Sequence, residues 1–465
     1  MELAVPKELQ VISKALAKKG ARAVIVGGAV RDALLKKECK DWDIEVYNID
    51  NLEVLNSYLK GFGSVNSVGK SFGILKLKID NYEFDFALPR KESKVAKGHR
   101  GFNVTLDATL DFKEAARRRD FTINAIGYDI EKKQLLDPYE GVADLKQKIL
   151  RVVDPTTFKE DPLRVYRALQ FAARFRLSVD TDTKQLCKEM VAAGMLEELP
   201  KERIWGEWQK FLLKAEQPSI AFELMREFGI IERYFQELDA IIGVAQDPFY
   251  HPEGDIWKHT MLSLDAMVKL LKSEAISDAK LRLKLLLSIV SHDLGKATTT
   301  EIIDERIRSI GHEKAGISLT KSLLYKLTSE HKFVESTLPL VEHHLKPQQL
   351  FLGKAKAAAI RRLARKVNIY ELVLVAKADF LGRMTKEAQS SEFEAGKWLL
   401  KRAKELQVES KAIDNIITGK DLIALGLQPS SQFKVILEDV YNELIEERIA
   451  TKQEALEYVT SKYGE

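Results

Sequence analysis

The sequence has little cysteine and no long apolar run. Two of its 465 residues are cysteines, Cys39 and Cys187, which stand far apart and in no metal-ligand spacing. A disulfide framework is therefore not expected, and a reducing compartment fits. The strongest apolar run, from Leu285 to Val290, is too short to cross a bilayer, and the first residues lack the apolar core of a signal peptide. We expect a cytoplasmic protein with no membrane partner.

A strong overall charge is also missing. The formal net charge is +4, and apolar and charged residues make up 45% and 31% of the chain, which is typical of a folded globular protein. The total charge therefore does not by itself indicate a nucleic-acid partner. Basic residues do cluster at 117–119 and again between Lys354 and Lys366. Such clusters are typical of phosphate contacts or of a solvated helix face, and both interpretations stay open.

Strand patterns occupy the first part of the chain and helical patterns the rest. Apolar runs and alternation predict strands at 23–26, 43–47, 74–79 and 83–87. The aperiodic stretch 91–106 is predicted to be a loop. From about residue 140 onward, Leu, Ala, Lys and Glu dominate, as they do in helices. At roughly 150 residues per domain, we expect about three domains and an α+β fold with helical extensions.

Two glycines after the first predicted strand form a candidate phosphate site. Gly27 and Gly28 open a predicted helix that carries Arg31. Glycines let backbone amides approach a phosphate, a helix N-terminus favours negative charge, and an arginine can hold two phosphate oxygens. A purely structural turn uses the same pattern, and that alternative stays open.

Paired carboxylates on a predicted strand form a candidate metal site. Asp41 and Asp43 are two residues apart, so on a strand they share one face at about 6–7 Å along the backbone. Carboxylates so placed can share two magnesium ions, about 3.5–4 Å apart in two-metal phosphoryl-transfer sites. Asp85, on another alternating strand, is a candidate third carboxylate. The alternative is an exposed acidic turn.

A third group of polar residues follows in the helix-like segment 118–125. Arg119, Asp120 and Asn124 combine a cation, a carboxylate and an amide. This mixture suits a ribose and a triphosphate, although a surface ion-pair network uses the same residue types.

The order of these motifs resembles a known enzyme family. Gly-Gly-x-Val-Arg-Asp at 27–32, Asp-x-Asp at 41–43 and Arg-Arg-Asp-Phe-Thr-x-Asn-Ala at 118–125 resemble class II tRNA nucleotidyltransferases and bacterial poly(A) polymerases. The resemblance continues through 160–168 and 171–175, in the family's order. It implies a polymerase-beta-like nucleotidyltransferase head, followed by a helical neck, body and tail.

Within this resemblance, two side chains are candidates for reading the base. Asp161 and Arg164 are three residues apart, which on a helix places them on one face. Asp only accepts hydrogen bonds and Arg only donates them, so the pair complements the pairing edges of C and A and mismatches those of U and G. Arg167, one turn further, is a candidate triphosphate ligand. An intrahelical salt bridge is the alternative.

Histidines form the second candidate site. Seven of the eight lie between His251 and His344. Their order resembles the HD phosphohydrolase superfamily, and that resemblance implies a divalent transition metal such as Ni²⁺ or Mn²⁺. The four positions that match its core ligands are His259, His292, Asp293 and Asp379. We expect His312, together with His343 or His344, to support a second ion.

A nucleotidyltransferase head followed by an HD domain resembles the bacterial multifunctional CCA proteins. We therefore expect a head at 1–140, a helical neck and body at 141–245, an all-α HD domain at 246–385 and a helical tail at 386–465. The resemblance implies addition of C, C and A from CTP and ATP to the 3′ end of tRNA, with 2′,3′-cyclic phosphodiesterase or phosphatase activity in the HD domain. A monomer or a homodimer is expected.

Three alternative functions stay open. The first is a poly(A) polymerase, against which the segment 68–73 favours the tRNA enzymes. The second is an enzyme that adds only CC or only A. The third is an RNA-binding protein whose only activity is HD-domain phosphohydrolysis.

Overall fold

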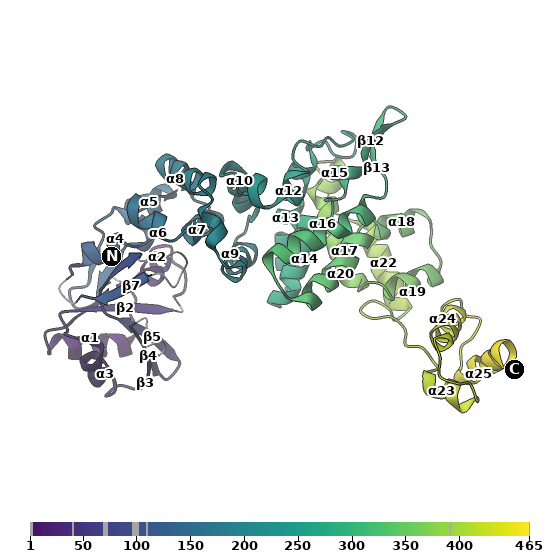
Figure 1. Ribbon diagram of the computed structural model, residues 1–465, viewed down its shortest axis with the longest axis horizontal. Coiled ribbons are helices and arrows are strands. Elements are labelled where there is room, and N and C mark those ends of the chain that lie inside the picture. The colour runs from purple at the N-terminus through teal and green to yellow at the C-terminus, as the bar shows by residue number, and fades with distance from the viewer. Residues whose placement is uncertain are drawn as a thin grey trace. The chain divides into compact units, whose positions relative to one another are not determined.

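The computed structural model describes residues 3–39, 41–67, 73–94, 102–107, 110–390 and 392–464. The chain divides into two compact units, residues 1–230 and 231–465, and each is described here by itself (Figure 1). The finer division into four segments stays a prediction. Among the described residues, no helix combines the length and the apolar character needed to cross a membrane.

A mixed sheet of seven strands forms the base of the first unit in the described part of the chain. Its order is β3-β4-β5-β2-β1-β8-β9, and all neighbours run antiparallel except β2 and β5, which are parallel. The strands are β1 (Arg22–Val26), β2 (Trp42–Tyr47), β3 (Ser64–Ser67), β4 (Ile74–Ile79), β5 (Tyr82–Ala87), β8 (Gly127–Asp129) and β9 (Gln134–Leu136). The four strands predicted from alternation are confirmed to within one residue.

The sheet buries a large apolar core against helices that include α1, α2 and α3. The alternating residues of β2 and β5, such as Ile44, Val46 and Phe84, point into this core, which α1 and α3 also fill with Leu9 and Leu55. The opposite set of residues on the same strands is therefore left for the functional face. The helices are α1 (Lys7–Ala17), α2 (Gly28–Leu34), α3 (Leu52–Leu59), α4 (Phe112–Arg117) and α5 (Gly141–Gln147), with a 3-10 turn at Thr122–Asn124.

Two local predictions in this unit are wrong. The helix-like segment 118–125 is not a helix, because α4 ends at Arg117 and only a short 3-10 turn follows. The predicted loop 91–106 contains the paired strands β6 (Arg90–Lys94) and β7 (Phe102–Leu106). The first of these strands is polar throughout, so backbone pairing and not apolar alternation defines it. Residues 95–101 lie outside the described residues, as do 68–72.

The first unit ends in a bundle of helices. Helix α7 packs against both α9 and α10. The elements are β10 (Ile149–Leu150), α6 (Pro155–Glu160), α7 (Leu163–Phe175), β11 (Ser178–Val179), α8 (Thr181–Ala192), a 3-10 turn (Met195–Glu198), α9 (Lys201–Lys214) and α10 (Ser219–Glu227).

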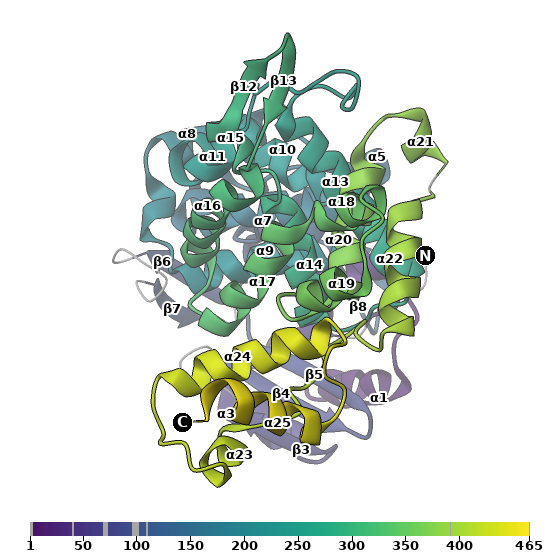
Figure 2. The same cartoon turned by 90° about the vertical axis from the view of Figure 1, so that its right-hand side faces the viewer.

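The second unit is built almost entirely of helices, with α13 and α20 packed along one another. An antiparallel hairpin, β12–β13, projects from them in both views (Figure 1 and Figure 2) and is an addition to the expected all-α domain. The elements up to 389 are α11 (Ile230–Tyr234), α12 (Gln236–Asp239), α13 (Ile256–Ser273), α14 (Ala279–Ser291), α15 (Lys296–Thr299), β12 (Thr300–Ile303), β13 (Arg306–Ser309), α16 (His312–Leu327), α17 (His331–His343), α18 (Lys346–Leu352), α19 (Ala357–Ala364), α20 (Ile369–Gly382) and α21 (Lys386–Gln389).

The last helices have a small core of their own. These are α23 (Gly419–Ala424), α24 (Gln432–Ile445) and α25 (Lys452–Tyr463), which follow α22 (Glu394–Glu405) and gather together in Figure 2. Three arginines of the second basic cluster face this part of the chain and pair with its carboxylates: Arg361 with Glu447, Arg362 with Glu446 and Arg365 with Glu438. These arginines therefore hold the tail against α19.

Candidate functional site

The central strand β2 presents a row of carboxylates on the face away from the core. Asp43 is exposed and Glu45 half-buried on β2, and Asp41 is exposed just before the strand begins. The parallel neighbour β5 sets Asp85 opposite Asp43 in register. Partial burial raises the pKa of Asp43, and the nearby carboxylates add to this against the opposing effect of Arg119. Like charges gathered in this way are typical of a cation site.

Glu45 was missed by the sequence analysis and lies inside this row. Its Oε1 accepts a hydrogen bond from Arg119 Nη2 at 2.7 Å, and its Oε2 accepts one from the Tyr47 hydroxyl at 2.7 Å. The guanidinium of Arg119 also lies against Gly27, whose φ is +70°; a Cβ there would approach Arg119 Nη1 to 3.0 Å. Gly27 therefore makes room for Arg119 beside Asp43. The period of two along β2 was the signal that would have found Glu45.

A chain of hydrogen bonds fixes four of the predicted nucleotide ligands. Arg31 Nη1 donates to Asn124 Oδ1 at 2.5 Å, Asn124 Nδ2 donates to Asp120 Oδ1 at 2.9 Å, and Arg167 Nε donates to Asp120 Oδ2 at 2.6 Å. Arg31 also donates to Asp32 and is only 4% exposed, and burial lowers its pKa.

The carboxylate at the centre of this chain is stabilised in its charged form. Burial acts to raise the pKa of Asp120, but the neighbouring Arg167, Asn124 and Arg164 outweigh it and hold that pKa below its usual value. The four hydrogen-bonded residues thus form one polar wall of the cavity.

The predicted helical spacing of Asp161 and Arg164 is wrong. Asp161 has extended backbone angles, φ −121° and ψ 98°, between α6 and α7, so the two residues do not share a helix. Pro162 causes this, because the residue before a proline is pushed out of the helical region.

The two residues nevertheless line one cavity, each with its own support. Arg203 of α9, which the sequence analysis missed, lies 3.2 Å from Asp161 Oδ2. Arg164 donates to the carbonyl oxygens of Thr157 at 2.9 Å and Arg118 at 2.6 Å. A fixed acceptor and a fixed donor therefore border the same space.

That cavity holds about 520 Å³ and is strongly cationic. Ten of its lining side chains are basic and three are acidic, Asp43, Asp120 and Asp161. A smaller hollow of about 260 Å³ beside it is lined by Glu45 and Asp85, and both hollows share Asp43. Such a cavity can take a polyanion with its cation at Asp43. Gly28, Arg31, Arg119, Asn124, Arg164 and Arg167 also line it.

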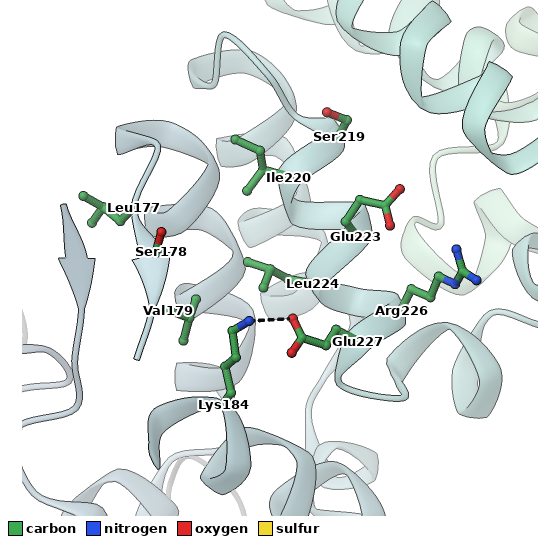
Figure 3. Close-up of a pocket in the computed structure, with 10 residues that line it drawn as sticks. All are labelled: Leu177, Ser178, Val179, Lys184, Ser219, Ile220, Glu223, Leu224, Arg226 and Glu227. Carbon is green, nitrogen blue, oxygen red and sulfur yellow. Dashed lines mark hydrogen bonds and ion pairs between the residues drawn. The ribbon is translucent and has the colours of Figure 1, made fainter. Parts of the chain in front are cut away.

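A larger hollow of about 610 Å³ lies elsewhere in the first unit, between β11, α8 and α10 (Figure 3). The described residues around it include no predicted site residue. An ion pair of 2.9 Å between Lys184 and Glu227 crosses it, and the remaining lining is largely apolar. The residues predicted to bind the nucleotide line the cationic cavity and not this hollow.

In the second unit, the four predicted HD residues come together. His259 of α13 has its Nε2 3.1 Å from Asp379 Oδ1 of α20 and 4.0 Å from Asp293 Oδ2. His292, at the end of α14, has its Nε2 3.2 Å from Asp293 Oδ2 and 4.0 Å from Asp379 Oδ1. All four side chains are buried. His292 Nε2 makes no hydrogen bond to a described residue, as expected of an atom that binds a metal, whereas Asp293 Oδ2 is contacted at 2.7 Å by Lys296 Nζ.

A second group of ligands shares Asp293 with the first. His312 Nε2 lies 3.3 Å and His344 Nε2 4.0 Å from Asp293 Oδ1. His344 therefore lies in the cluster, whereas His343 is outside both groups. Burial, together with His292 and His312, lowers the pKa of His344 to about 3, so this imidazole is neutral, as a metal ligand must be.

Backbone carbonyls aim three of these imidazoles at the centre. The Nδ1 atoms of His292, His312 and His344 each lie 2.7 Å from the carbonyl oxygen three residues earlier. Because a carbonyl only accepts, each Nδ1 carries the hydrogen, and in the neutral ring the lone pair is on Nε2. All three Nε2 atoms lie within 4.0 Å of a carboxylate oxygen of Asp293. Burial acts to lower the pKa of His292 and of His312, but Asp293 outweighs it and raises both pKa values.

Three further residues support the cluster and were missed by the sequence analysis. Glu253 Oε1 lies 2.8 Å from His259 Nδ1 and orients that ring. Lys296 Nζ lies 2.7 Å from Asp293, and Arg383 Nη2 lies 3.3 Å from Asp379. Their only sequence signal was nearness to predicted ligands.

Two family models match the first part of the chain. A family model described as "Poly A polymerase head domain" matches residues 23–151, and one described as "Probable RNA and SrmB-binding site of polymerase A" matches 176–242. Among solved structures, the chain is similar to a CCA-adding enzyme of Bacillus stearothermophilus in complex with CTP (TM-score 0.66, 18% identity, 98% of this chain and 97% of that one). It is also similar to a Thermotoga maritima CCA-adding enzyme complexed with tRNA (TM-score 0.60, 20% identity, 98% and 96%). At these identities the likeness shows the fold.

Curated relatives are closer in sequence. A multifunctional CCA protein of Methylobacillus flagellatus is 36% identical over 79% of this chain and 86% of its own length. One from Xanthomonas euvesicatoria is 35% identical over 87% of this chain and 93% of its own. An identity of this size over most of both chains, together with a nucleotidyltransferase head at its expected place, shows that the chain belongs to the family of multifunctional CCA proteins.

Proposed function

We propose that this protein adds C, C and A to the 3′ end of tRNA, using CTP and ATP. The observation that carries the proposal is the row of carboxylates on β2 and β5 at the edge of a cavity with ten basic side chains. Carboxylates and a cationic cavity together suit a nucleoside triphosphate and its magnesium ions. Family membership supports the reaction and the requirement for a divalent metal.

In this proposal, the carboxylates hold the magnesium ions and the other cavity residues hold the nucleotide. The terminal 3′-hydroxyl of tRNA attacks the α-phosphate, a new P–O bond forms, the bond to the β-phosphate oxygen breaks and pyrophosphate leaves. Magnesium held by Asp41 and Asp43, with Asp85 beside them, would assist loss of the hydroxyl proton and neutralise the leaving group. Arg119 and the wall of Arg31, Asp120, Asn124 and Arg167 hold the ribose and the triphosphate, with Gly28 at the cavity's edge.

Asp161 and Arg164 select the base in this proposal. Their fixed acceptor and donor complement C and A, and a wrong base leaves buried groups unpaired at about 1–3 kcal/mol each. We expect Asp161→Ala to lower CTP and ATP incorporation and to relax discrimination against UTP about 10- to 100-fold, which competition assays on a tRNA transcript measure. Asp182→Ala, at an exposed position of α8, is the control. Unchanged discrimination would remove Asp161 from base selection.

The reaction is tested with three tRNA transcripts, which lack CCA, CA or A. The proposal requires CTP to extend the first two, each only to the C positions, and ATP to extend only the third. Extension of only the first two transcripts, by CTP, would mean a CC-adding enzyme. Extension of only the third, by ATP, would mean an A-adding enzyme. Runs of adenylate on any RNA would mean a poly(A) polymerase.

We further propose that the second unit is a metal-dependent phosphohydrolase that acts on 2′,3′-cyclic phosphates. His259, His292, Asp293 and Asp379 would hold one divalent ion, and Asp293, His312 and His344 a second, with Ni²⁺ or Mn²⁺ suited to imidazole and carboxylate ligands. A metal held there would supply a hydroxide at neutral pH. Hydrolysis would join a water-derived oxygen to phosphorus and break one ester P–O bond, and the leaving oxygen would take up a proton. The buried His292 Nε2, which makes no hydrogen bond to a described residue, supports this proposal.

Glu253 positions a metal ligand in this proposal. Carboxylates that orient a ligating histidine typically contribute 10- to 100-fold in metal affinity. We therefore expect Glu253→Gln to weaken binding of Mn²⁺ or Ni²⁺ to the second unit by about 10- to 100-fold, measured by titration calorimetry. The control is Glu301→Gln on the exposed hairpin. An unchanged affinity would show that His259 needs no orienting partner.

A further inference from the structure

Exposed apolar side chains gather around one cavity of the second unit. Of the twelve large apolar side chains that are exposed in the described part of the chain, four line this cavity of about 780 Å³. They are Phe249, Tyr250, Leu352 and Met384, which are 75%, 49%, 69% and 53% exposed. Scattered exposed apolar residues are ordinary, but a group around one concave site indicates a ligand with an apolar face.

Aromatic rings give this cavity flat surfaces that are already held in place. Phe249 and Tyr250 pack edge to face with their centroids 4.9 Å apart. Arg306 lies 5.6 Å from the centre of the Tyr250 ring and is itself paired with Asp247 at 3.1 Å. On the buried side of the cavity, two more rings, Phe380 and Phe393, stack at 5.2 Å.

Charged and metal-binding side chains line the same cavity where it borders the HD cluster. His344, Asp379 and Arg383 line the same cavity, as does Lys386. Arg383 has one donor on Asp379, while its Nε is buried and has no hydrogen-bond partner among the described residues. A cavity with aromatic faces at its rim and a guanidinium beside metal ligands complements a flat heterocycle that carries an anion.

We propose that Phe249 and Tyr250 hold the base of the substrate in this cavity and that Arg383 holds its phosphate. The proposal rests on the proposed phosphohydrolase, because it names the residues that position the substrate of that centre. The rim and the metal cluster are coupled through one short segment: Phe249 and Tyr250 lead directly into Glu253, which orients His259. Base binding and presentation of the phosphate are thus parts of one structure.

The proposal is tested by binding, so that it does not depend on catalysis. The full chain, stripped of metal with EDTA, is titrated with adenosine 3′-monophosphate and with inorganic phosphate in a calorimeter. We expect Phe249→Ala and Tyr250→Ala each to weaken binding of the nucleotide about tenfold and to leave inorganic phosphate unchanged. Arg383→Gln weakens both. Ile302→Ala, 79% exposed on β12 and outside the cavity, is the matched control.

The first unit is identical in all these variants, so differences between them belong to the second unit. Their nucleotide addition to tRNA, which should be unchanged, checks folding. Equal nucleotide affinity in the Phe249→Ala/Tyr250→Ala double variant and the unaltered chain would overturn the site. Absence of cyclic-phosphate hydrolysis while the binding differences persist would overturn the phosphohydrolase instead.

A dinucleotide with a 3′-terminal phosphate distinguishes the two sources of such a ligand. Tighter binding than the mononucleotide identifies an RNA end, and equal binding identifies free nucleotides. Both outcomes support a nucleoside-phosphate site, whereas binding of the dinucleotide that no rim variant weakens would contradict it.

Discussion

Asp43→Ala is expected to abolish addition of both C and A, with a fall in rate of about 1,000-fold or more, equivalent to about 4 kcal/mol of lost transition-state stabilisation. Asp43 belongs to both hollows of the head and stands beside Asp85 in register. No other carboxylate lines both hollows in the described residues, so loss of this side chain would remove the proposed ligand of the magnesium ions that serve the triphosphate and the attacking hydroxyl. Incorporation of labelled CTP and ATP into tRNA transcripts measures the effect.

The control is Asp50→Ala, an exposed aspartate just after the same strand, which should keep full activity. Asp41→Ala is expected to match Asp43→Ala, while Asp85→Asn tests the third carboxylate separately. Each variant should keep any hydrolysis by the second unit. Nucleotide incorporation that is present in the unaltered protein and lost in these variants separates an enzyme with two centres from an RNA-binding protein with one. Wild-type incorporation by Asp41→Ala or Asp43→Ala would refute the proposed metal site.

For the carboxylate row, alternation predicts which face of a strand each residue occupies but not which strands pair. A strand buried on one face must put every second residue on the other, so Asp43 and Asp85 were predictable as functional-face residues on their own strands. Their pairing was not predictable, because it depends on β2 and β5 lying parallel and in register although residues 48–81 separate them in sequence. Glu45 was predictable by the same alternation and was overlooked.

The backbone at Asp161 and Arg164 is set by a proline and not by helical spacing. Residues that are three apart share a face only when both are in one helix, and Pro162 keeps Asp161 out of the helical region. The sequence analysis predicted a base-reading pair from this spacing and from the family resemblance. The helical spacing was wrong, although both residues line one cavity. Arg203, which lies 3.2 Å from Asp161, comes from a helix some forty residues later and had no sequence signal.

The sequence could not decide whether His343 or His344 is the metal ligand, because that choice also depends on tertiary packing. The two residues are adjacent at the end of α17, where either side chain could turn inward. The packing of this helix on α14 and α16 turns His344 toward His312, at 3.3 Å between their Nε2 atoms. Adjacent residues differ by about 100° around a helix, so tertiary packing decides which one becomes a ligand.

Asp293→Ala is expected to abolish metal binding and cyclic-phosphate hydrolysis by the second unit, with a loss of about 1,000-fold or more in rate, and to leave CTP incorporation into tRNA unchanged. Asp293 belongs to two of the three groups of possible metal ligands around the HD cluster in the described residues, and it joins His259 and His292 to His312 and His344, so its loss should empty both positions. Metal analysis after dialysis against Mn²⁺ or Ni²⁺, and hydrolysis of a 2′,3′-cyclic nucleotide, are the measurements.

Removal of Asp293 also leaves Lys296 and His312 without their carboxylate, at 2.7 Å and 3.3 Å, so the variant is expected to lose stability. Asp293→Asn keeps the shape and part of the hydrogen bonding, and it should lose metal and hydrolysis while melting closer to the unaltered protein. Asp414→Ala, at a position 91% exposed in the tail, controls for loss of an aspartate as such. A folded Asp293→Asn protein that still bound two ions and hydrolysed the nucleotide at the original rate would exclude Asp293 as the shared ligand. The proposed head chemistry uses Asp43 and not this centre, so tRNA extension by the same preparation should be unchanged, and a parallel loss would show that the two activities are coupled.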